Sequence, residues 1–275
     1  MIQLQVRALF LFPAIVLLIG CTQPQKTDEE RERSRLVRSN IKSITEYKTS
    51  FIPNASEKER ISHLTIFNKK GFAVKEIDYN ETGIAWHIFM HEYDKNDNLI
   101  CTTIKNSDRS LFGKETRKYD EKNNLKELIY FLSDGTVEYR YAYLFDEEGR
   151  VVEMEVYWPT ELSAVHKFIY ERKKKLEDVE YSSDKKLLGR KSYKYDVHEN
   201  LLEEFQSGTD SSKSNKIIYL YNLINQITQQ VTYAGELVQN TLSYEYDKKY
   251  FLSVKNRFSS TGKMTAKYRY QYELY

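Results

Sequence analysis

A short motif, an aromatic residue followed by Asp, Asn or Glu, returns every 25 or 26 residues through most of this 275-residue chain. The nine aromatic positions, called anchors below, are Phe67, Tyr93, Tyr119, Phe145, Tyr170, Tyr195, Tyr221, Tyr246 and Tyr272. Every anchor is aromatic although only 14% of the chain is aromatic, so chance does not explain the spacing. A fixed period of this size is the sequence mark of a repeat architecture.

Each repeat contains two turns. The first follows the anchor, as in residues 146–150, where Gly149 lies near the end of the turn. The second lies half a period later, as in Asp134-Gly135. Asp begins turns of this kind, and Gly or Asn accepts the left-handed backbone conformation that ends them. We therefore expect two reversals of chain direction in every repeat.

Between the turns, aromatic or apolar residues alternate with polar ones. Tyr139, Tyr141 and Tyr143 share one face, with Glu138 and Arg140 on the other. A period of two is the signature of a half-buried strand, so one repeat is predicted to be one β-hairpin. The expected fold is all-β, an antiparallel meander of eight to nine hairpin repeats with roughly seventeen strands. We expect it to form a twisted or spiralling extended sheet.

The segment Tyr119–Glu127 reads Tyr-Asp-Glu-Lys-Asn-Asn-Leu-Lys-Glu and resembles the YD repeat of Rhs-type surface proteins. Asp134-Gly135 matches the second turn of that unit, and the resemblance covers about residues 60–275. The period is longer than in YD repeats, and only Gly71 and Gly149 fill the first-turn glycine position. The resemblance implies a scaffold, and it supplies no catalytic residue for this chain.

The N-terminal segment has the layout of a lipoprotein signal. Arg7 is followed by the apolar run Ala8 to Ile19, then by Gly20-Cys21 and a polar stretch. That run is short for a membrane span and typical of a signal peptide. The residues Leu18 to Cys21 resemble a bacterial lipobox. The resemblance implies cleavage after Gly20 and attachment of lipid to Cys21.

The predicted organisation is a signal peptide over residues 1–20, a polar tether over 21–38 with at most a helical turn or two, and a hairpin-repeat domain over 39–275. Acyl chains hold a protein on a membrane by about 0.8 kcal/mol per buried methylene. Residue 22 is Thr and not Asp. By resemblance to enterobacterial sorting, this favours the outer membrane of a diderm bacterium over the inner membrane.

Composition narrows the partners further. The formal net charge is +2, which argues against strong electrostatic binding of nucleic acid. Two cysteines exclude a disulfide scaffold. With Cys21 acylated, Cys101 is alone in an alternating run and is interpreted as a small apolar strand residue.

A second aromatic column lies two residues before the later anchors. It comprises Tyr143, Phe168, Tyr193, Tyr219, Tyr244 and Tyr270. Tyrosine is enriched at interfaces, so these residues form a candidate binding surface for a protein or a glycan. The alternative is that the rings are the core of the sheet, since alternation alone explains them.

No motif for catalysis, phosphate binding or a cofactor is found. His87 and His91 share a strand face about 13 Å apart, too far for one metal ion without a bridging neighbour. Turn residues such as Asp120 are interpreted as caps rather than calcium ligands. The basic run 172–175 is interpreted as a solvated loop, with contact to an anionic surface as the alternative. No enzyme activity, cofactor or metal is predicted.

Three functions fit these features. The first is a membrane-anchored, non-enzymatic repeat lipoprotein whose β surface binds a protein or polysaccharide. The second is a structural or envelope-assembly lipoprotein that faces the periplasm. The third is an outer-membrane β-barrel, which the alternating strands would allow, although the predicted lipid, the few glycines and the Lys- and Glu-rich faces argue against it.

Overall fold

The computed structural model describes residues 28–52, 57–209 and 214–275. Cys21 and the rest of the predicted signal lie outside the described residues. Within the described ranges the chain has one helix, α1 (Asp28–Arg38), followed by strands only. The strands are β1 (Ile41–Ser50), β2 (Arg60–Phe67), β3 (Ala73–Tyr79), β4 (Ala85–Tyr93), β5 (Leu99–Asn106), β6 (Leu111–Tyr119), β7 (Leu125–Leu132), β8 (Val137–Phe145), β9 (Val151–Tyr157), β10 (Leu162–Glu171), β11 (Lys174–Ser182), β12 (Leu187–Tyr195), β13 (Leu201–Gly208), β14 (Ser214–Tyr221), β15 (Ile227–Ala234), β16 (Leu237–Tyr246), β17 (Leu252–Ser259) and β18 (Met264–Leu274).

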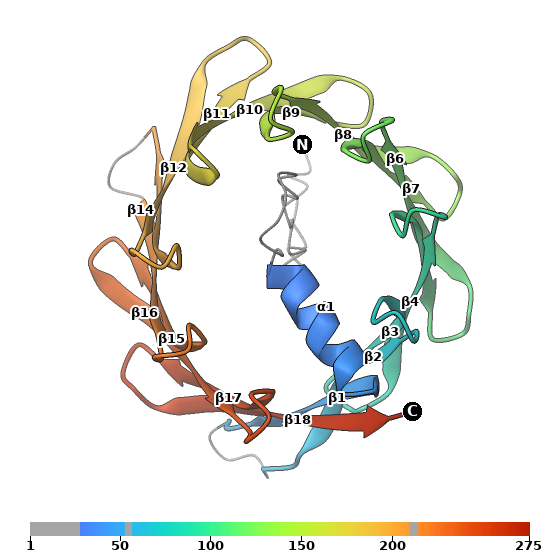
Figure 1. Ribbon diagram of the computed structural model, residues 1–275, viewed down its shortest axis with the longest axis vertical. Coiled ribbons are helices and arrows are strands. Elements are labelled where there is room, and N and C mark those ends of the chain that lie inside the picture. Colours follow the sequence, from blue (N-terminus) through green and yellow to red (C-terminus); the bar gives the residue numbers. More distant parts are fainter. Residues whose placement is uncertain (1–27, 53–56, 210–213) are drawn as a thin grey trace, which may run out of the picture.

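The sheet closes into a barrel. Each strand pairs antiparallel with its sequence neighbours, and β1 pairs with β18, from Ile41 opposite Leu274 to Ser50 opposite Ala266. Figure 1 shows the resulting ring of eighteen strands seen along its axis. The predicted extended or spiralling sheet is therefore wrong, because the first and last strands satisfy each other's edge groups, which an open sheet would leave unpaired. The architecture agrees instead with the barrel of the third alternative.

The two predicted turns per repeat are confirmed, and the first turn is built as expected. In the β6–β7 turn, one carboxylate oxygen of Asp120 accepts hydrogen bonds from the backbone N–H groups of Lys122 and Asn124, both at 2.8 Å. Asn123 ends the turn with a φ of 64°. Gly135 takes the corresponding positive φ, 85°, in the second turn between β7 and β8. All first turns gather at one mouth of the barrel and all second turns at the other.

The anchor tyrosines join neighbouring turns. The hydroxyl of Tyr119, for example, donates to the carbonyl of Leu99 at 2.9 Å, at the start of the preceding strand pair. The same bond to a residue 19 or 20 positions earlier is made by Tyr93, Tyr195, Tyr221, Tyr246 and Tyr272. This bond fixes the distance between successive first turns, which explains why Tyr is the commonest anchor.

The anchors face the lumen. Tyr272 packs against the cluster formed by Leu36 of α1, Ile41 and Phe251, and α1 lies inside the ring of strands (Figure 1). Since side chains alternate along a strand, positions an even number of residues before an anchor point inward. The neighbouring positions point outward.

The outward face is charged. Lys118 and Arg140 bind the two carboxylate oxygens of Glu127 at 2.7 and 3.2 Å. Further ion pairs around the ring join Lys167 with Glu153, Arg190 with Glu177, Lys194 with Glu203, and Arg269 with Glu59, which immediately precedes β2. The barrel thus turns its anchor rings inward and much of its charge outward.

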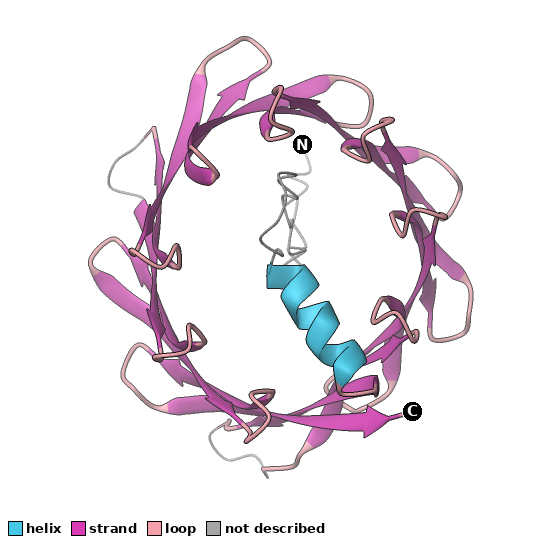
Figure 2. Ribbon diagram, in the orientation of Figure 1, coloured by secondary structure: helices cyan, strands magenta, loops and turns pink. Residues whose placement is uncertain are grey.

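Helix α1 lies at the first-turn mouth, and Figure 2 shows it reaching from the wall toward the middle of the opening. The guanidinium of Arg35 donates to the carbonyl of Tyr250 at 2.7 Å and lies over the ring of Phe251. Arg33 lies over the ring of Phe72 in the β2–β3 turn. The helix covers three turns of the predicted tether, and its contacts hold the N-terminal part of the chain at this mouth.

Candidate functional site in the lumen

The six residues of the second aromatic column all lie on the lumen face. They belong to six successive even-numbered strands, β8 to β18, so they circle the wall and do not form one patch. Tyr143 is only 7% exposed and packs with Leu128 and Val151. The others are half-buried. The rings therefore form part of the wall and border the lumen, and their role as a binding surface stays a prediction.

Several of these tyrosines bind a polar side chain on the next strand. The hydroxyl of Tyr219 donates to Glu204 at 2.6 Å, and that of Tyr244 to Gln230 at 3.2 Å. Burial, together with the bond to Glu204, raises the pKa of Tyr219. Tyr193 lies 4.6 Å from the ammonium of Lys175, whose pKa burial lowers. The wall is thus an alternation of rings with fixed hydrogen-bonding groups.

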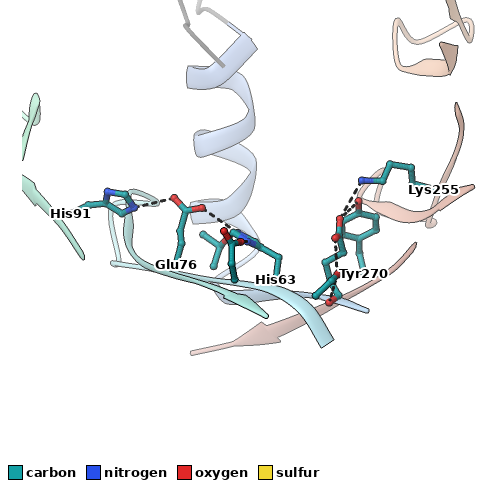
Figure 3. A network of polar contacts seen from close by, with 9 residues as sticks. His63, Glu76, His91, Lys255 and Tyr270 are labelled. Atoms are coloured by element: carbon teal, nitrogen blue, oxygen red, sulfur yellow. Dashed lines mark hydrogen bonds and ion pairs between the residues drawn. The ribbon is translucent and has the colours of Figure 1, made fainter. Parts of the chain in front are cut away.

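One polar cluster lies where the barrel closes. Glu46 on β1 accepts a hydrogen bond from Tyr270 at 2.6 Å and pairs with Lys255 at 3.2 Å (Figure 3). Ser62 donates to the same carboxylate at 2.7 Å. Burial raises the pKa of Glu46, but the charge of Lys255 and these hydrogen bonds lower it more, so the net shift is downward. The cluster ties β17, β18, β1 and β2 together on the lumen side.

A second cluster continues along the wall. Glu76 on β3 binds His63 at 3.1 Å with one oxygen and His91 at 2.9 Å with the other, and His63 also binds Asp78 at 2.7 Å (Figure 3). Burial lowers the pKa of His63, but the hydrogen bonds to Asp78 and Glu76 raise it to about 9. Burial raises the pKa of Glu76, but its bonds to the two histidines lower it to about 2.

The polar groups extend one hairpin further. His91 also bonds Thr102 at 3.1 Å, and Arg117 reaches the same hydroxyl at 3.4 Å and pairs with Glu115. Burial raises the pKa of Glu115 in spite of this pairing. We call these two clusters, which extend around the wall from Lys255 on β17 to Arg117 on β6, the lumenal polar belt.

This belt was not predicted from the sequence, although a signal for it is present. His91 shares a carboxylate with His63, through Glu76, and not with His87. His63 and His91 lie four and two residues before their anchors, which are both inward positions. The parity of each strand could therefore have placed them on one face. His87 instead stacks against Trp86, with ring centroids 4.9 Å apart.

Aromatic rings stack toward the second-turn mouth. Tyr130 and Tyr139 lie with centroids 5.1 Å apart, and Trp158 stacks on Tyr139 at 5.9 Å. Gly113 on β6 makes this possible, because a Cβ there would fall on the ring of Tyr130. Trp158 is 54% exposed. These three rings, called the aromatic ladder below, offer one open ring face.

Within the ranges that the structure describes, His, Cys, Asp and Glu side chains form no group of three or more that could hold a metal ion. In those same ranges no helix is long and apolar enough to cross a membrane. Cys101 is buried and unbridged, on the outward side of β5 opposite Glu92 and Thr116.

No protein-family model matches the chain, and no curated protein matches it. Among solved structures, a porin-like protein from Bacteroides uniformis has 13% identity and a TM-score of 0.47, with 85% of this chain and 98% of that chain covered. A porin-like protein from Bacteroides vulgatus has 10% identity and a TM-score of 0.31, with the same coverage of 85% and 98%. A TcdB2-TccC3 structure has 13% identity and a TM-score of 0.35, and covers 81% of this chain but only 14% of that chain. All three TM-scores are below 0.5, and the closed barrel follows from the pairing of β1 with β18.

Proposed function

We propose that this chain is a non-enzymatic lipoprotein of the bacterial cell envelope, anchored by a lipid on Cys21, whose barrel binds a protein or glycan partner in its lumen. The observation that carries the proposal is the distribution of side chains between the two faces. Rings and fixed hydrogen-bonding groups line the inside, and paired charges cover much of the outside.

The lumen offers what binding of a polar, extended ligand requires. Tyrosine and tryptophan provide apolar contact area together with a polar group. The lumenal polar belt adds carboxylates, histidines and a guanidinium whose positions are fixed by mutual hydrogen bonds. Groups held in place before binding lose little freedom when a ligand arrives. A peptide or polysaccharide segment matches this alternation of rings and polar groups.

A second candidate is a barrel that itself spans the outer membrane. Closure favours it, because spanning sheets must leave no edge unpaired, and an even number of antiparallel strands is usual. The outward charges oppose it. A Lys or Arg on the lipid face costs about 2–4 kcal/mol at the midplane of the bilayer, and Arg140 and Arg190 lie well inside their strands on the outward face.

The two candidates differ in what Cys21→Ser does. We expect wild-type protein in the detergent phase and the variant folded and soluble without detergent, because no strand of the proposed molecule spans the bilayer. A spanning barrel would still need detergent after this substitution, and its migration would change on heating. Protease treatment of intact cells then distinguishes a surface position from a periplasmic one.

Binding in the lumen has its own test. Envelope polysaccharides and peptides are titrated against the soluble Cys21→Ser chain, with Tyr and Trp fluorescence as the readout. Tyr193→Ala and Tyr219→Ala are expected to abolish binding, whereas the adjacent outward variants Lys194→Ala and Leu220→Ala retain it. Equal loss in both sets, or substrate turnover in a hydrolase screen, would contradict the proposal.

A further inference from the structure

The first-turn mouth of the barrel is divided into two chemically different parts. The tips of its turns are the second and third residues after each anchor. Five of these turns, which follow β10, β12, β14, β16 and β2, are called the basic–apolar arc. Their ten tip residues, all exposed, are Arg172, Lys173, Val197, His198, Leu223, Ile224, Lys248, Lys249, Lys69 and Lys70. The arc has six Lys or Arg tips and no Asp or Glu tip.

The arc is continuous around the mouth. Strands β10 to β18 follow one another in the barrel, and β18 is joined through β1 to β2. The gap between the β16–β17 and β2–β3 turns is occupied by Leu274 and Tyr275, which are 53% and 46% exposed. The apolar tips are more exposed still, at 91% for Val197 and 104% for Leu223.

The remaining three first turns have a different composition. Their six tips are Lys95, Asn96, Glu121, Lys122, Glu147 and Glu148, with three acidic residues against two basic ones. With Asp120 and Asp146, three of these glutamates line a hollow between the β6–β7 and β8–β9 turns. The mouth therefore has a basic and apolar side and an acidic side.

The charges of the arc are largely available. Lys70 pairs with Asp97 at 2.7 Å and remains 66% exposed. Among the described residues, Lys173, Lys248 and Lys249 make no ion pair. The Asp residues of these turns are engaged as caps, as Asp196 is with the N–H groups of His198 and Asn200. Fully exposed Leu and Val beside unpaired lysines do not stabilise the folded monomer. Such a combination is typical of contact with an anionic lipid interface.

The segment between Cys21 and α1 determines which mouth lies near the membrane. Helix α1 is held there by the contacts of Arg33 and Arg35, and Asp28 begins it. Six residues lie between Cys21 and Asp28, so the Cα atoms of these two residues are at most about 25 Å apart. If Cys21 carries the lipid, as proposed above, the first-turn mouth is the part of the barrel nearest to the bilayer.

We propose that the basic–apolar arc docks on the anionic surface of the bilayer that holds the lipid anchor. Val197, Leu223 and Ile224 enter the headgroup region, and the lysines and arginine of the arc contact lipid phosphates. The acidic side of the mouth is repelled by the same surface. The barrel is therefore held in one tilted orientation and does not rotate freely on its tether.

The test measures membrane binding without the lipid. The Cys21→Ser chain is sedimented with vesicles of phosphatidylcholine containing phosphatidylglycerol, and with vesicles of phosphatidylcholine alone. Binding is expected only to the anionic vesicles and is expected to weaken with salt. Each lysine near such a surface contributes about fivefold to partitioning at low ionic strength. The double variant Lys248→Gln/Lys249→Gln should therefore bind about 25-fold more weakly.

Two controls make the result specific. Lys185→Gln/Lys186→Gln removes the same charge from an exposed turn at the opposite mouth, and is expected to change binding less than twofold. Leu223→Trp should show a blue-shifted emission that brominated lipids quench, whereas Leu237→Trp at the opposite mouth should not. Far-UV circular dichroism and thermal melting check that each variant is folded.

The proposal is overturned if the Lys248/Lys249 variant binds anionic vesicles like its parent, or if both control positions respond equally. It is also overturned if the Cys21→Ser chain shows no preference for anionic vesicles. These outcomes leave the lipid anchor intact, because anchoring is measured by detergent partitioning of the wild-type chain. Insertion that resists high salt and alkali would instead contradict the proposed function itself.

Discussion

The His63–Glu76 pair makes a prediction about stability above neutral pH. His63 is 28% exposed and Glu76 31% exposed, and His63 contacts Asp78 as well, so its positive charge is held by two carboxylates. The net effect raises the pKa of His63 from 6.5 to about 9. A base whose pKa is raised in the folded state stabilises that state fully below its unfolded pKa. The contribution is lost as the pH rises through the folded pKa.

The size of the effect follows from the two values. Between pH 7 and pH 10, linkage gives a loss of about 2 kcal/mol from this one histidine. For a barrel of this size that corresponds to about 4–8 °C in melting temperature. Glu76 acts in the opposite range. Its pKa is lowered to about 2, so its contribution is present above pH 4.5 and is lost only as the pH falls toward 2.

The assay compares two proteins at each pH, so that effects of pH common to both cancel. The melting temperature of His63→Gln is subtracted from that of the wild type at each pH. The difference is expected to be large at pH 7 and close to zero at pH 10. His198→Gln, in an exposed turn, serves as the control. In an NMR titration His63 should titrate near pH 9, and titration of His63 at its ordinary pKa of 6.5 would refute the reasoning.

Three other substitutions test the packing described above. Leu36→Ala removes a side chain that is 4% exposed and should make α1 accessible to trypsin. The melting temperature of the barrel should not change, since the helix contacts only the mouth. A simultaneous loss of helix protection and barrel stability would contradict this. Gly113→Ala places a methyl group on the ring of Tyr130 and should lower the free energy of unfolding by about 1–3 kcal/mol. Thermal melting measures this loss, and the near-UV circular dichroism of the stacked rings should weaken. Tyr270→Phe deprives Glu46 of a hydrogen bond, so the pKa of Glu46 should rise and the acid-unfolding midpoint should move to higher pH; an unchanged midpoint would show that the bond is not formed.

The hairpins could be predicted because their causes are local. In the first turns, each capping side chain and each residue of positive φ lie within five residues of the anchor, so the columns of the sequence show them directly. Closure could not be predicted in the same way. Register shifts recur between the anchor and the residue before it, as at Glu92/Tyr93 and Lys118/Tyr119, and such bulges increase the twist of a sheet. The total twist that these bulges add over all repeats decides whether β18 meets β1. That total cannot be read from the sequence.

Part of the lumenal polar belt could have been predicted from the sequence. The parity rule assigns His63, His91 and Tyr270 to the face of the anchors, but it does not say which face is inside. That depends on the direction of curvature, which only the closed barrel reveals. The contacts of Glu76 with two histidines also depend on the register of β2, β3 and β4. An alignment of the repeats does not show which side chains of neighbouring strands lie diagonally opposite each other.

The arrangement of faces limits how this barrel can meet a membrane and a ligand. Among the described residues, ion pairs interrupt the outward face of the strands, so in the proposed arrangement contact with the bilayer comes from the N-terminal segment or from a mouth. If the first-turn mouth with α1 and the basic–apolar arc faces the lipid, the second-turn mouth is the open entrance to the lumen. The aromatic ladder ends toward that mouth, where Trp158 is 54% exposed. A partner that enters would therefore contact the aromatic ladder before it reaches the lumenal polar belt. Its apolar surface would be recognised first, and its polar groups afterwards.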